Sequence, residues 1–141
     1  MPALNFQKRF AHLVESGEKR QTIRKRRKDG RDPTPGCRLY LFTGMRTKEC
    51  RPLIVQRTVE SLRRMAARFG VFGSAVECGA VFPIKIWRDV EGAKLPHLGP
   101  NDLYLDEEQL ARSDGFSSWS EMLDWFEKTH GLPFKGLLIR W

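Results

Sequence analysis

The sequence predicts an α+β protein in which a mostly antiparallel β-sheet or small barrel is flanked by helices. The first observation is the order of elements: a helix, several strands with short helices between them, a helix and a final strand. The second is that strands rarely alternate with helices long enough to serve as parallel crossovers. The third is that 141 residues without a repeat or a dividing linker predict one domain over residues 1–141.

The first helix is expected from Phe6 to Ser16, where apolar residues recur at i, i+4, i+7 and i+8. Gly17 is well placed as its C-terminal stop. A basic run follows directly. Lys19 and Thr22 are therefore expected just past the end of the helix, in a turn or an extended segment.

Strand signals follow an exposed loop. Residues 27–36 contain two prolines and two glycines and predict that loop. Residues 37–44 and 51–59 are rich in β-branched and aromatic residues, so they predict two strands, with a hairpin connection at 44–50. The apolar residues of 60–69 have helical spacing and predict a helix.

The second half of the chain continues with an interrupted strand over residues 74–87. Pro83 within it favours an edge position or a bulge, because proline cannot donate to a neighbouring strand. Residues 91–102 predict a loop, residues 107–112 a short helix and residues 134–141 a terminal strand.

The clearest helix covers residues 117–131. Ser118 and Glu121 form a capping-box pattern at its start, and Gly131 marks its end. The apolar stripe expected to face the core consists of Trp119, Met122, Leu123 and Phe126.

Cysteine and histidine usage disfavours disulfide and metal sites. Cys37, Cys50 and Cys78 are odd in number, widely spaced and contain no C-x-x-C pair, and the three histidines are equally scattered. The sequence also lacks a P-loop and the motifs G-x-G-x-x-G, H-E-x-x-H and G-x-S-x-G. We therefore expect neither a metal nor a cofactor.

Hydropathy predicts a cytoplasmic protein without a membrane partner. No apolar run approaches the roughly 18 residues needed to cross a bilayer. The N-terminal residues also lack the apolar core of a signal peptide.

The charge distribution points to an anionic partner. The net charge is +8, and the cations crowd into residues 8–68, whereas residues 101–127 are acidic. A cationic half of this kind favours a nucleic-acid or nucleotide partner. The alternative is that these cations form an ordinary solvated surface.

Lys19 and Thr22 stand out inside the basic run as a pair with chemical potential. A threonine hydroxyl becomes a nucleophile only when a nearby group removes its proton. A lysine can do so if its pKa falls, and neighbouring cations lower that pKa by disfavouring the ammonium form. Because K-x-x-T is a common spacing, a solvated lysine and a structural threonine remain the alternative.

The residues around this pair resemble the opening signature of the ASCH domain superfamily. Residues 6–24, FQKRFAHLVESGEKRQTIR, contain an F-x-x-R-F start, a G-x-K junction and then K-x-x-T-x-R. The resemblance continues through the glycine-led strand at 35–44 and a D-G-F turn at 114–116. It implies a PUA-like fold, which is a β-barrel with helices around a cleft.

Within that superfamily, the signature is most similar to the small bacterial amidohydrolases that remove the acyl group from N(4)-acetylcytidine. The resemblance implies that Lys19 is the base and Thr22 the nucleophile. It also implies a catalytic carboxylate on or near Asp114, where the family has the longer glutamate. The fallback carboxylates are Glu107, Glu108 and Glu121.

Three further residues have two readings each. Arg24 could donate to an oxyanion or hold ribose or phosphate, and it could equally pair with an acidic surface residue. Arg46, in the expected hairpin loop, either lines the cleft or is a plain exposed arginine. Trp119 could stack on a base, but its place on the helix stripe favours core packing.

The remaining cations of the basic run, Lys25, Arg26, Arg27 and Lys28, are better suited to contacts with a nucleic-acid backbone than to chemistry. The expected partner is thus a modified cytosine nucleoside or RNA. The favoured function is an amidohydrolase acting on an acylated cytosine nucleoside. The alternatives are a non-catalytic RNA-binding PUA-like module and a ribonuclease that uses the same basic cleft.

Overall fold

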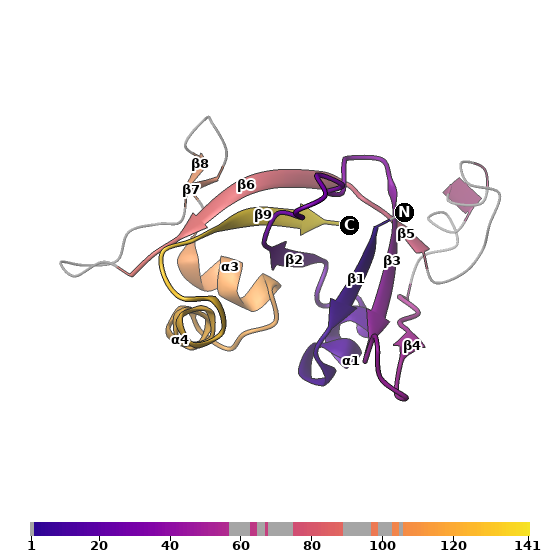
Figure 1. Ribbon diagram of the computed structural model, residues 1–141, viewed down its shortest axis with the longest axis horizontal. Helices are drawn as coiled ribbons and strands as arrows, with labels where there is room; N and C mark the ends of the chain where they lie inside the picture. Colours follow the sequence, from indigo (N-terminus) through magenta and orange to yellow (C-terminus); the bar gives the residue numbers. More distant parts are fainter. Residues whose placement is uncertain are drawn as a thin grey trace.

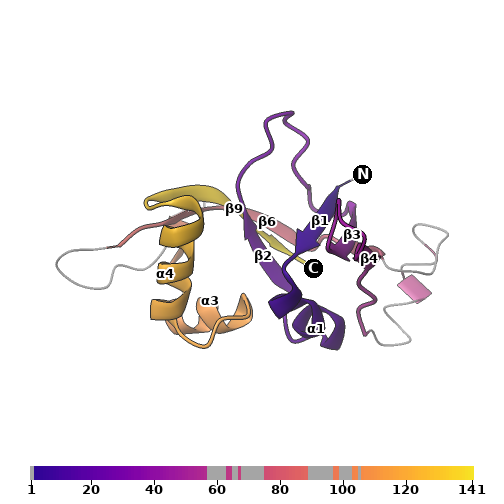
Figure 2. The ribbon, with the colours of Figure 1, turned by 60° about the horizontal axis from the view of Figure 1, so that its bottom comes forward.

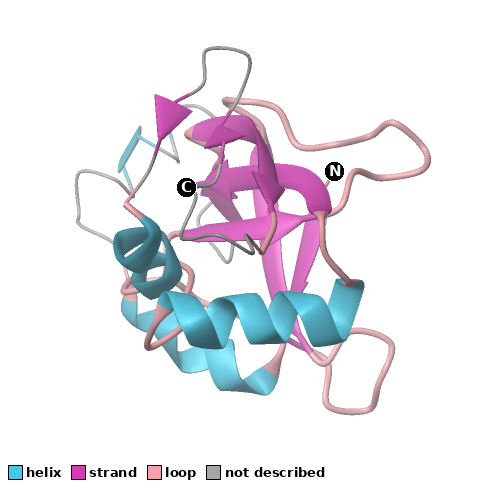
Figure 3. Ribbon diagram, turned by 90° about the vertical axis from the view of Figure 1, so that its left-hand side faces the viewer, coloured by secondary structure: helices cyan, strands magenta, loops and turns pink. Residues whose placement is uncertain are grey.

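The computed structural model describes residues 2–56, 63–64, 67, 75–88, 97–98, 103–104 and 106–141, and these residues form an α+β fold. Two β-sheets stand side by side, and the helices gather along one side of them (Figures 1 and 3). Within the described ranges the two sheets are hydrogen-bonded separately and do not close into a barrel.

The first sheet is built around β3 (Arg38–Thr43). Strand β1 (Ala3–Phe6) runs parallel to β3, while β4 (Arg51–Pro52) and β5 (Ala75–Glu77) pair with it antiparallel. In β3 the side chains alternate between half-buried and buried, as expected for a strand with one face on the core.

The second sheet is antiparallel throughout its described strands. Its order is β2 (Gln21–Arg24), β9 (Phe134–Arg140), β6 (Ala80–Ile86), β7 (His97–Leu98) and β8 (Leu103–Tyr104). The expected preference for antiparallel pairing therefore holds everywhere except between β1 and β3.

Helices α1 (Lys8–Ser16), α3 (Glu107–Ser113) and α4 (Trp119–His130) complete the described fold. Helix α4 begins at its predicted cap, because the Ser118 hydroxyl accepts a hydrogen bond from the Glu121 amide at 3.1 Å. Gly131 is its C-cap. The four residues predicted for its core stripe are all buried.

The start of the first helix was predicted wrongly. Phe6 belongs to strand β1, where it lies opposite Thr43, and α1 begins only at Lys8. Gln7 between them has an extended backbone with φ −64° and ψ 151°. The predicted end is confirmed: Gly17 caps α1 with φ 84°, a left-handed conformation that glycine adopts without steric cost.

Most other expected elements are confirmed. The strands predicted at 37–44 and 134–141 are β3 and β9, the interrupted strand at 74–87 is β5 followed by β6, and the helix at 107–112 is α3. The strand predicted over 51–59 is shorter in the described residues: it comprises Arg51 and Pro52, and the Leu53 amide also donates to the Leu41 carbonyl of β3. The loop predicted over 91–102 was wrong at His97 and Leu98, which form strand β7. The rest of that loop, residues 57–59 and most of the predicted helix at 60–69 lie outside the described residues.

Pro83 lies in β6 opposite Leu137 of β9. On the other side of β6, strand β7 pairs only with Ile84 and Lys85. In the part of the chain that the structure describes, Pro83 therefore faces no partner strand on that side, which fits the expected edge position.

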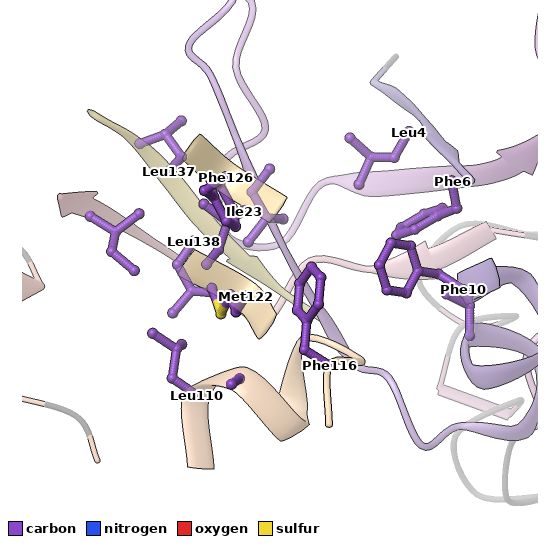
Figure 4. Close-up of a cluster of buried hydrophobic side chains, with 14 of the residues drawn as sticks. Leu4, Phe6, Phe10, Ile23, Leu110, Phe116, Met122, Phe126, Leu137 and Leu138 are labelled. Carbon is purple, nitrogen blue, oxygen red and sulfur yellow. The ribbon is translucent and has the colours of Figure 1, made fainter. Parts of the chain in front are cut away.

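The buried core joins the two sheets through aromatic side chains. One group of apolar side chains packs between the second sheet and helices α3 and α4, and another surrounds α1 and β1 (Figure 4). Phe116 lies between the two groups, and its ring centroid is 5.3 Å from that of Phe10. Strand β2 runs through the same central region, between α1 and the α3–α4 pair (Figure 2).

Candidate active site

Strand β2 carries the central residues of the candidate site. The chain turns back after Gly17, where the Lys19 amide donates to the Leu13 carbonyl at 3.0 Å, and then pairs with β9. Thr22 and Arg24 are two positions apart on the strand, so their side chains share one face. A hydrogen bond of 3.1 Å from Arg24 Nε to Thr22 Oγ1 confirms this arrangement.

Lys19 and Asp114 form a buried ion pair. Asp114 is the C-cap of α3, and Lys19 precedes β2. Lys19 Nζ lies 3.2 Å from Asp114 Oδ1 and also donates a hydrogen bond to the Asp114 backbone carbonyl. The two residues are only 2% and 5% exposed, so both charged groups are almost fully removed from water. A second contact is the Phe10 ring, whose centroid is 5.0 Å from Lys19 Nζ.

Burial shifts the pKa values of this pair toward the neutral forms. It lowers the pKa of Lys19, an effect that Asp114 opposes and the charge of Arg24 reinforces. It raises the pKa of Asp114, an effect opposed first by Lys19 and then by Arg24. Both directions favour an uncharged amine on Lys19, which is the form that can accept a proton.

Asp114 Oδ1 is a buried atom to which no described residue donates a hydrogen bond of regular geometry. Lys19 Nζ lies 3.2 Å from this oxygen and compensates its charge, and it also donates a hydrogen bond to the Asp114 backbone carbonyl. A buried carboxylate oxygen without a donor is costly.

Arg24 is held in place on three sides. Besides donating to Thr22, it donates from Nη2 to the Asn5 carbonyl at 2.5 Å, and its guanidinium lies 4.9 Å from the centroid of the Phe6 ring. Because Thr22 Oγ1 accepts from Arg24, the hydroxyl proton of Thr22 points elsewhere and is available to a base. The adjacent positive charge also favours negative charge on that oxygen.

These side chains face one cavity of about 270 Å³. Its polar floor is formed by Lys19, Thr22, Arg24 and Asp114. The aromatic residues of the wall are Phe6, Phe10, Phe116, Trp125 and Phe126. The remaining lining residues are Asn5, Gln7, Ile23, Lys25 and His130. The volume and the mixture of aromatic walls with a few polar groups suit a small planar ligand.

The cavity lining includes some of the predicted site residues and leaves out others. Lys19, Thr22, Arg24, Lys25 and Asp114 all contribute to it. The rest of the predicted set does not line it; these residues are Arg46, Arg26, Arg27, Lys28, Glu107, Glu108, Glu121 and Trp119. Arg46 is exposed in the turn after β3, with φ 66°.

The fallback carboxylates have other surroundings. Glu121 accepts from the Ser117 amide and from Arg9, and Glu108 accepts from the Trp119 amide at 3.3 Å. Both therefore bind groups at the start of α4. Burial raises the pKa of Glu107, whose Oε1 receives no hydrogen bond within the described ranges. Asp114 is thus the carboxylate of the predicted set that lines the cavity.

Several residues of the cavity lining were missed from the sequence, among them Trp125 and His130. Trp119 was considered for stacking, but it is only 9% exposed and packs in the core, as its stripe position favoured. Trp125 lines the cavity instead, with its ring centroid 5.6 Å from that of Phe116. His130 also lines it, and its pKa is lowered by burial and then by Lys25 and Arg24. The signal available for His130 was its position four residues after Phe126, in line with the apolar stripe.

Among the described residues, no group of three or more histidine, cysteine, aspartate or glutamate side chains could hold a metal ion. All three cysteines are free thiols. No helix in the described ranges combines the length and the apolar composition needed to cross a membrane. Comparisons with protein families, curated proteins and solved structures found no match for this chain.

Proposed function

We propose that this protein is an amidohydrolase of the ASCH type that removes the acyl group from N(4)-acetylcytidine or a related acylated cytosine nucleoside. The observation that carries the proposal is the cavity floor, where the buried Lys19–Asp114 pair, the Thr22 hydroxyl and Arg24 occur together. A PUA-like fold is part of the proposal. It is supported by the largely antiparallel sheets, the flanking helices and the cavity lined by the signature residues.

The first half of the reaction is acyl transfer to the protein. Neutral Lys19 takes the proton of the Thr22 hydroxyl, and Thr22 Oγ1 attacks the carbonyl carbon of the exocyclic amide. The resulting oxyanion is stabilised by the remaining donors of Arg24. The carbon–nitrogen bond then breaks, the cytosine amine leaves with the proton from Lys19, and an ester on Thr22 remains.

The second half is hydrolysis of that ester. Lys19 takes a proton from water, the hydroxide attacks the ester carbonyl, and the carboxylic acid leaves as Thr22 regains its proton. Asp114 contacts Lys19 Nζ through its carboxylate and its backbone carbonyl and so restrains the Lys19 amine. Although aspartate is one methylene shorter than the family glutamate, its position at the C-cap of α3 supports contact with Lys19.

The cavity wall suits a nucleobase. Trp125 and Phe116 contribute aromatic rings to the lining, and base–aromatic stacking is worth about 1–3 kcal/mol per base. Asn5 and Gln7 offer polar groups at the same cavity. Both features support a cytosine derivative as the substrate.

The second candidate is an RNA-binding module without catalysis, or a ribonuclease using the same cavity. The observation that favours it is the exposed basic segment after β2, whose Lys25 also lines the cavity. Binding to an RNA backbone weakens steeply as salt rises because counterions are released, whereas turnover of an uncharged nucleoside is much less sensitive to salt.

The test is deacylation of N(4)-acetylcytidine followed by chromatography. We expect the wild type to release cytidine, and Lys19→Ala and Thr22→Ala to lose roughly 10³-fold or more in kcat/KM. Thr22→Ser should keep measurable activity because it retains a hydroxyl. The matched control is Thr43→Ala, which removes a buried threonine of β3 outside the cavity. Folded wild type that hydrolyses neither this substrate nor other N(4)-acylcytidines, nor their 5′-monophosphates, would refute the proposal.

A further inference from the structure

Two smaller cavities continue from the candidate active site along the basic segment. One, of about 140 Å³, shares Arg24 and Lys25 with the active-site cavity. The next, of about 260 Å³, shares Arg27, Asp32 and Pro33 with the 140 Å³ cavity. The three cavities therefore adjoin in a row, and the cationic residues of the segment lie at each junction.

The side chains of Arg24 and Arg27, which line these cavities, are held by hydrogen bonds to backbone carbonyls of β1. Arg24 Nη2 donates to the Asn5 carbonyl at 2.5 Å, and Arg27 Nη2 donates to the Ala3 carbonyl at 2.9 Å. Each guanidinium carries five N–H donors, so both keep donors for another acceptor. Because the two anchors are carbonyls, they hold the side chains in place without neutralising their charges.

The positive charge around the 140 Å³ cavity is poorly compensated. Among the described residues, Arg24, Lys25 and Arg27 have no carboxylate within ion-pair distance. Asp32 is the acidic residue in the lining, but it accepts from the Arg27 amide at 2.8 Å and lies 3.8 Å from Arg26. Burial lowers the pKa of Arg24, Asp114 opposes this effect, and the charge of Arg27 adds to it, so Arg24 and Arg27 repel each other.

A cluster of fixed, unpaired cations at a small cavity is stabilised by an anion, and arginine matches phosphate oxygens particularly well. We infer that the 140 Å³ cavity binds a phosphate group attached to the sugar of the substrate. This inference rests on the proposed function, which supplies cytosine as the base. It makes the substrate a nucleotide or a unit of RNA rather than a free nucleoside. The 260 Å³ cavity beyond it is lined by Arg27 and Arg31 and also by Asp29 and Asp32, and its arginines are then the place for a neighbouring phosphate of a strand.

The experiment is calorimetric titration with cytidine, cytidine 5′-monophosphate and a short cytidine-containing RNA. None of these ligands carries an acyl group, so binding is measured without turnover. We expect the monophosphate to bind at least tenfold more tightly than cytidine at low salt, and this advantage to shrink as salt rises. Equal binding of the two, or binding of neither, would overturn the inference.

Three variants test whether the tighter binding of the monophosphate arises at the 140 Å³ cavity. Arg27→Gln and Lys25→Gln should each remove most of the advantage of the monophosphate, and Lys25 is exposed, so its replacement does not endanger folding. Lys28→Gln removes the same charge from the same segment but lines none of the three cavities, and it should leave the advantage unchanged. An equal effect of all three variants would show general electrostatic attraction and overturn the site.

The titration with RNA distinguishes a phosphate of an RNA strand from that of a mononucleotide. Tighter binding of RNA than of the monophosphate, lost in Arg31→Gln, indicates a strand along the row; equal binding indicates a mononucleotide. Both results support the phosphate site. If the wild type binds the monophosphate as expected but deacylates no acylated cytidine or acylated cytidine monophosphate, the phosphate site stands and the amidohydrolase proposal fails.

Discussion

Lys19 and Asp114 are 95 positions apart in the chain, yet Lys19 Nζ lies 3.2 Å from Asp114 Oδ1 and both side chains are buried. Two charges removed from water remain favourable only while each compensates the other. Removing either residue is therefore expected to lower the stability of the fold, in addition to its effect on the proposed chemistry.

The first prediction concerns the stability of this pair. Lys19→Met and Asp114→Leu should each lower the free energy of unfolding by about 3–5 kcal/mol, because each leaves one buried charge unpaired. The double variant should cost clearly less than the sum. The measurement is urea denaturation with a double-mutant cycle.

The control for that cycle is Lys8→Met, which removes an exposed ion pair with Glu49. Exposed pairs contribute about 0–1 kcal/mol, so its effect should be small. If the losses of Lys19→Met and Asp114→Leu simply add, the two residues do not interact in solution.

The second prediction concerns pH. Turnover should rise with pH as Lys19 loses its proton, and because burial lowers the pKa of Lys19, the rise should occur below 10.5. Over the same window the unfolded chain binds more protons than the folded one, so the free energy of unfolding should also rise with pH. A pH profile of kcat/KM whose rise begins only at or above 10.5 would contradict the proposed base.

The third prediction concerns the contact between β2 and β9. A Cβ added at Gly136 would lie 2.2 Å from the Arg24 carbonyl, so Gly136→Ala must push the two strands apart. We expect a loss of about 1–3 kcal/mol in the free energy of unfolding, together with reduced activity as Arg24 moves.

Gly79→Ala is the matched control, since its Cβ would make only an ordinary contact of 3.8 Å with the Arg140 carbonyl. Chemical denaturation of both variants checks the prediction. Comparable stability of Gly136→Ala and Gly79→Ala would show that β2 and β9 are not packed this closely.

The fourth prediction separates two tryptophans of α4. Trp125→Leu should raise KM for the acylated cytidine by roughly 5- to 100-fold, because it removes an aromatic wall of the cavity. Trp119→Leu should lower the melting temperature while leaving KM near that of the wild type, because Trp119 packs in the core. Steady-state kinetics with thermal denaturation distinguishes them, and an unchanged KM in Trp125→Leu would exclude stacking on this residue.

The fifth prediction concerns acid. Glu121 accepts from Arg9 at 2.6 Å and from the Ser117 amide at 2.8 Å, and these hydrogen bonds with Ser117 and Arg9 lower its pKa from 4.5 to about 2. Its contribution to stability is therefore complete above about pH 4.5 and is lost as pH falls toward about 2.

Urea unfolding of wild type and Glu121→Gln between pH 6 and pH 2 tests this. The difference in their free energies of unfolding should shrink as the medium becomes more acidic. A difference that stays constant over that range would mean that Glu121 titrates normally.

Elements whose sequence signals lie within the element itself were predicted well, and elements defined by distant pairing were not. Helix α4 was predicted with both ends because its cap at Ser118, its apolar stripe and its stop at Gly131 all lie within the segment. Strand β1 was missed because it has only four residues and is defined by its parallel pairing with the distant strand β3. Phe6 consequently was assigned to the helix that follows.

In the candidate site, too, local sequence identified some residues, while tertiary packing determined the features that were missed. Lys19 and Thr22 were found from sequence, but the basic run gave the impression of a solvated lysine, whereas Lys19 is almost fully buried. Nothing local predicts this, because its burial depends on the α3–α4 turn that carries Asp114. Trp125 was missed for a related reason: the face of α4 that meets the cavity is decided by tertiary packing.

The separation between Lys19 and Asp114 also has a kinetic consequence. Closing a loop of 95 residues costs chain entropy before the contact stabilises the chain, so we expect this pair to form late in folding. Strand β2 likewise has to find β9, whose residues lie more than a hundred positions further along the chain. A partly folded chain therefore has no cavity floor. Appearance of the slowly reacting, shielded Lys19 amine during refolding would mark the moment when the native arrangement is complete.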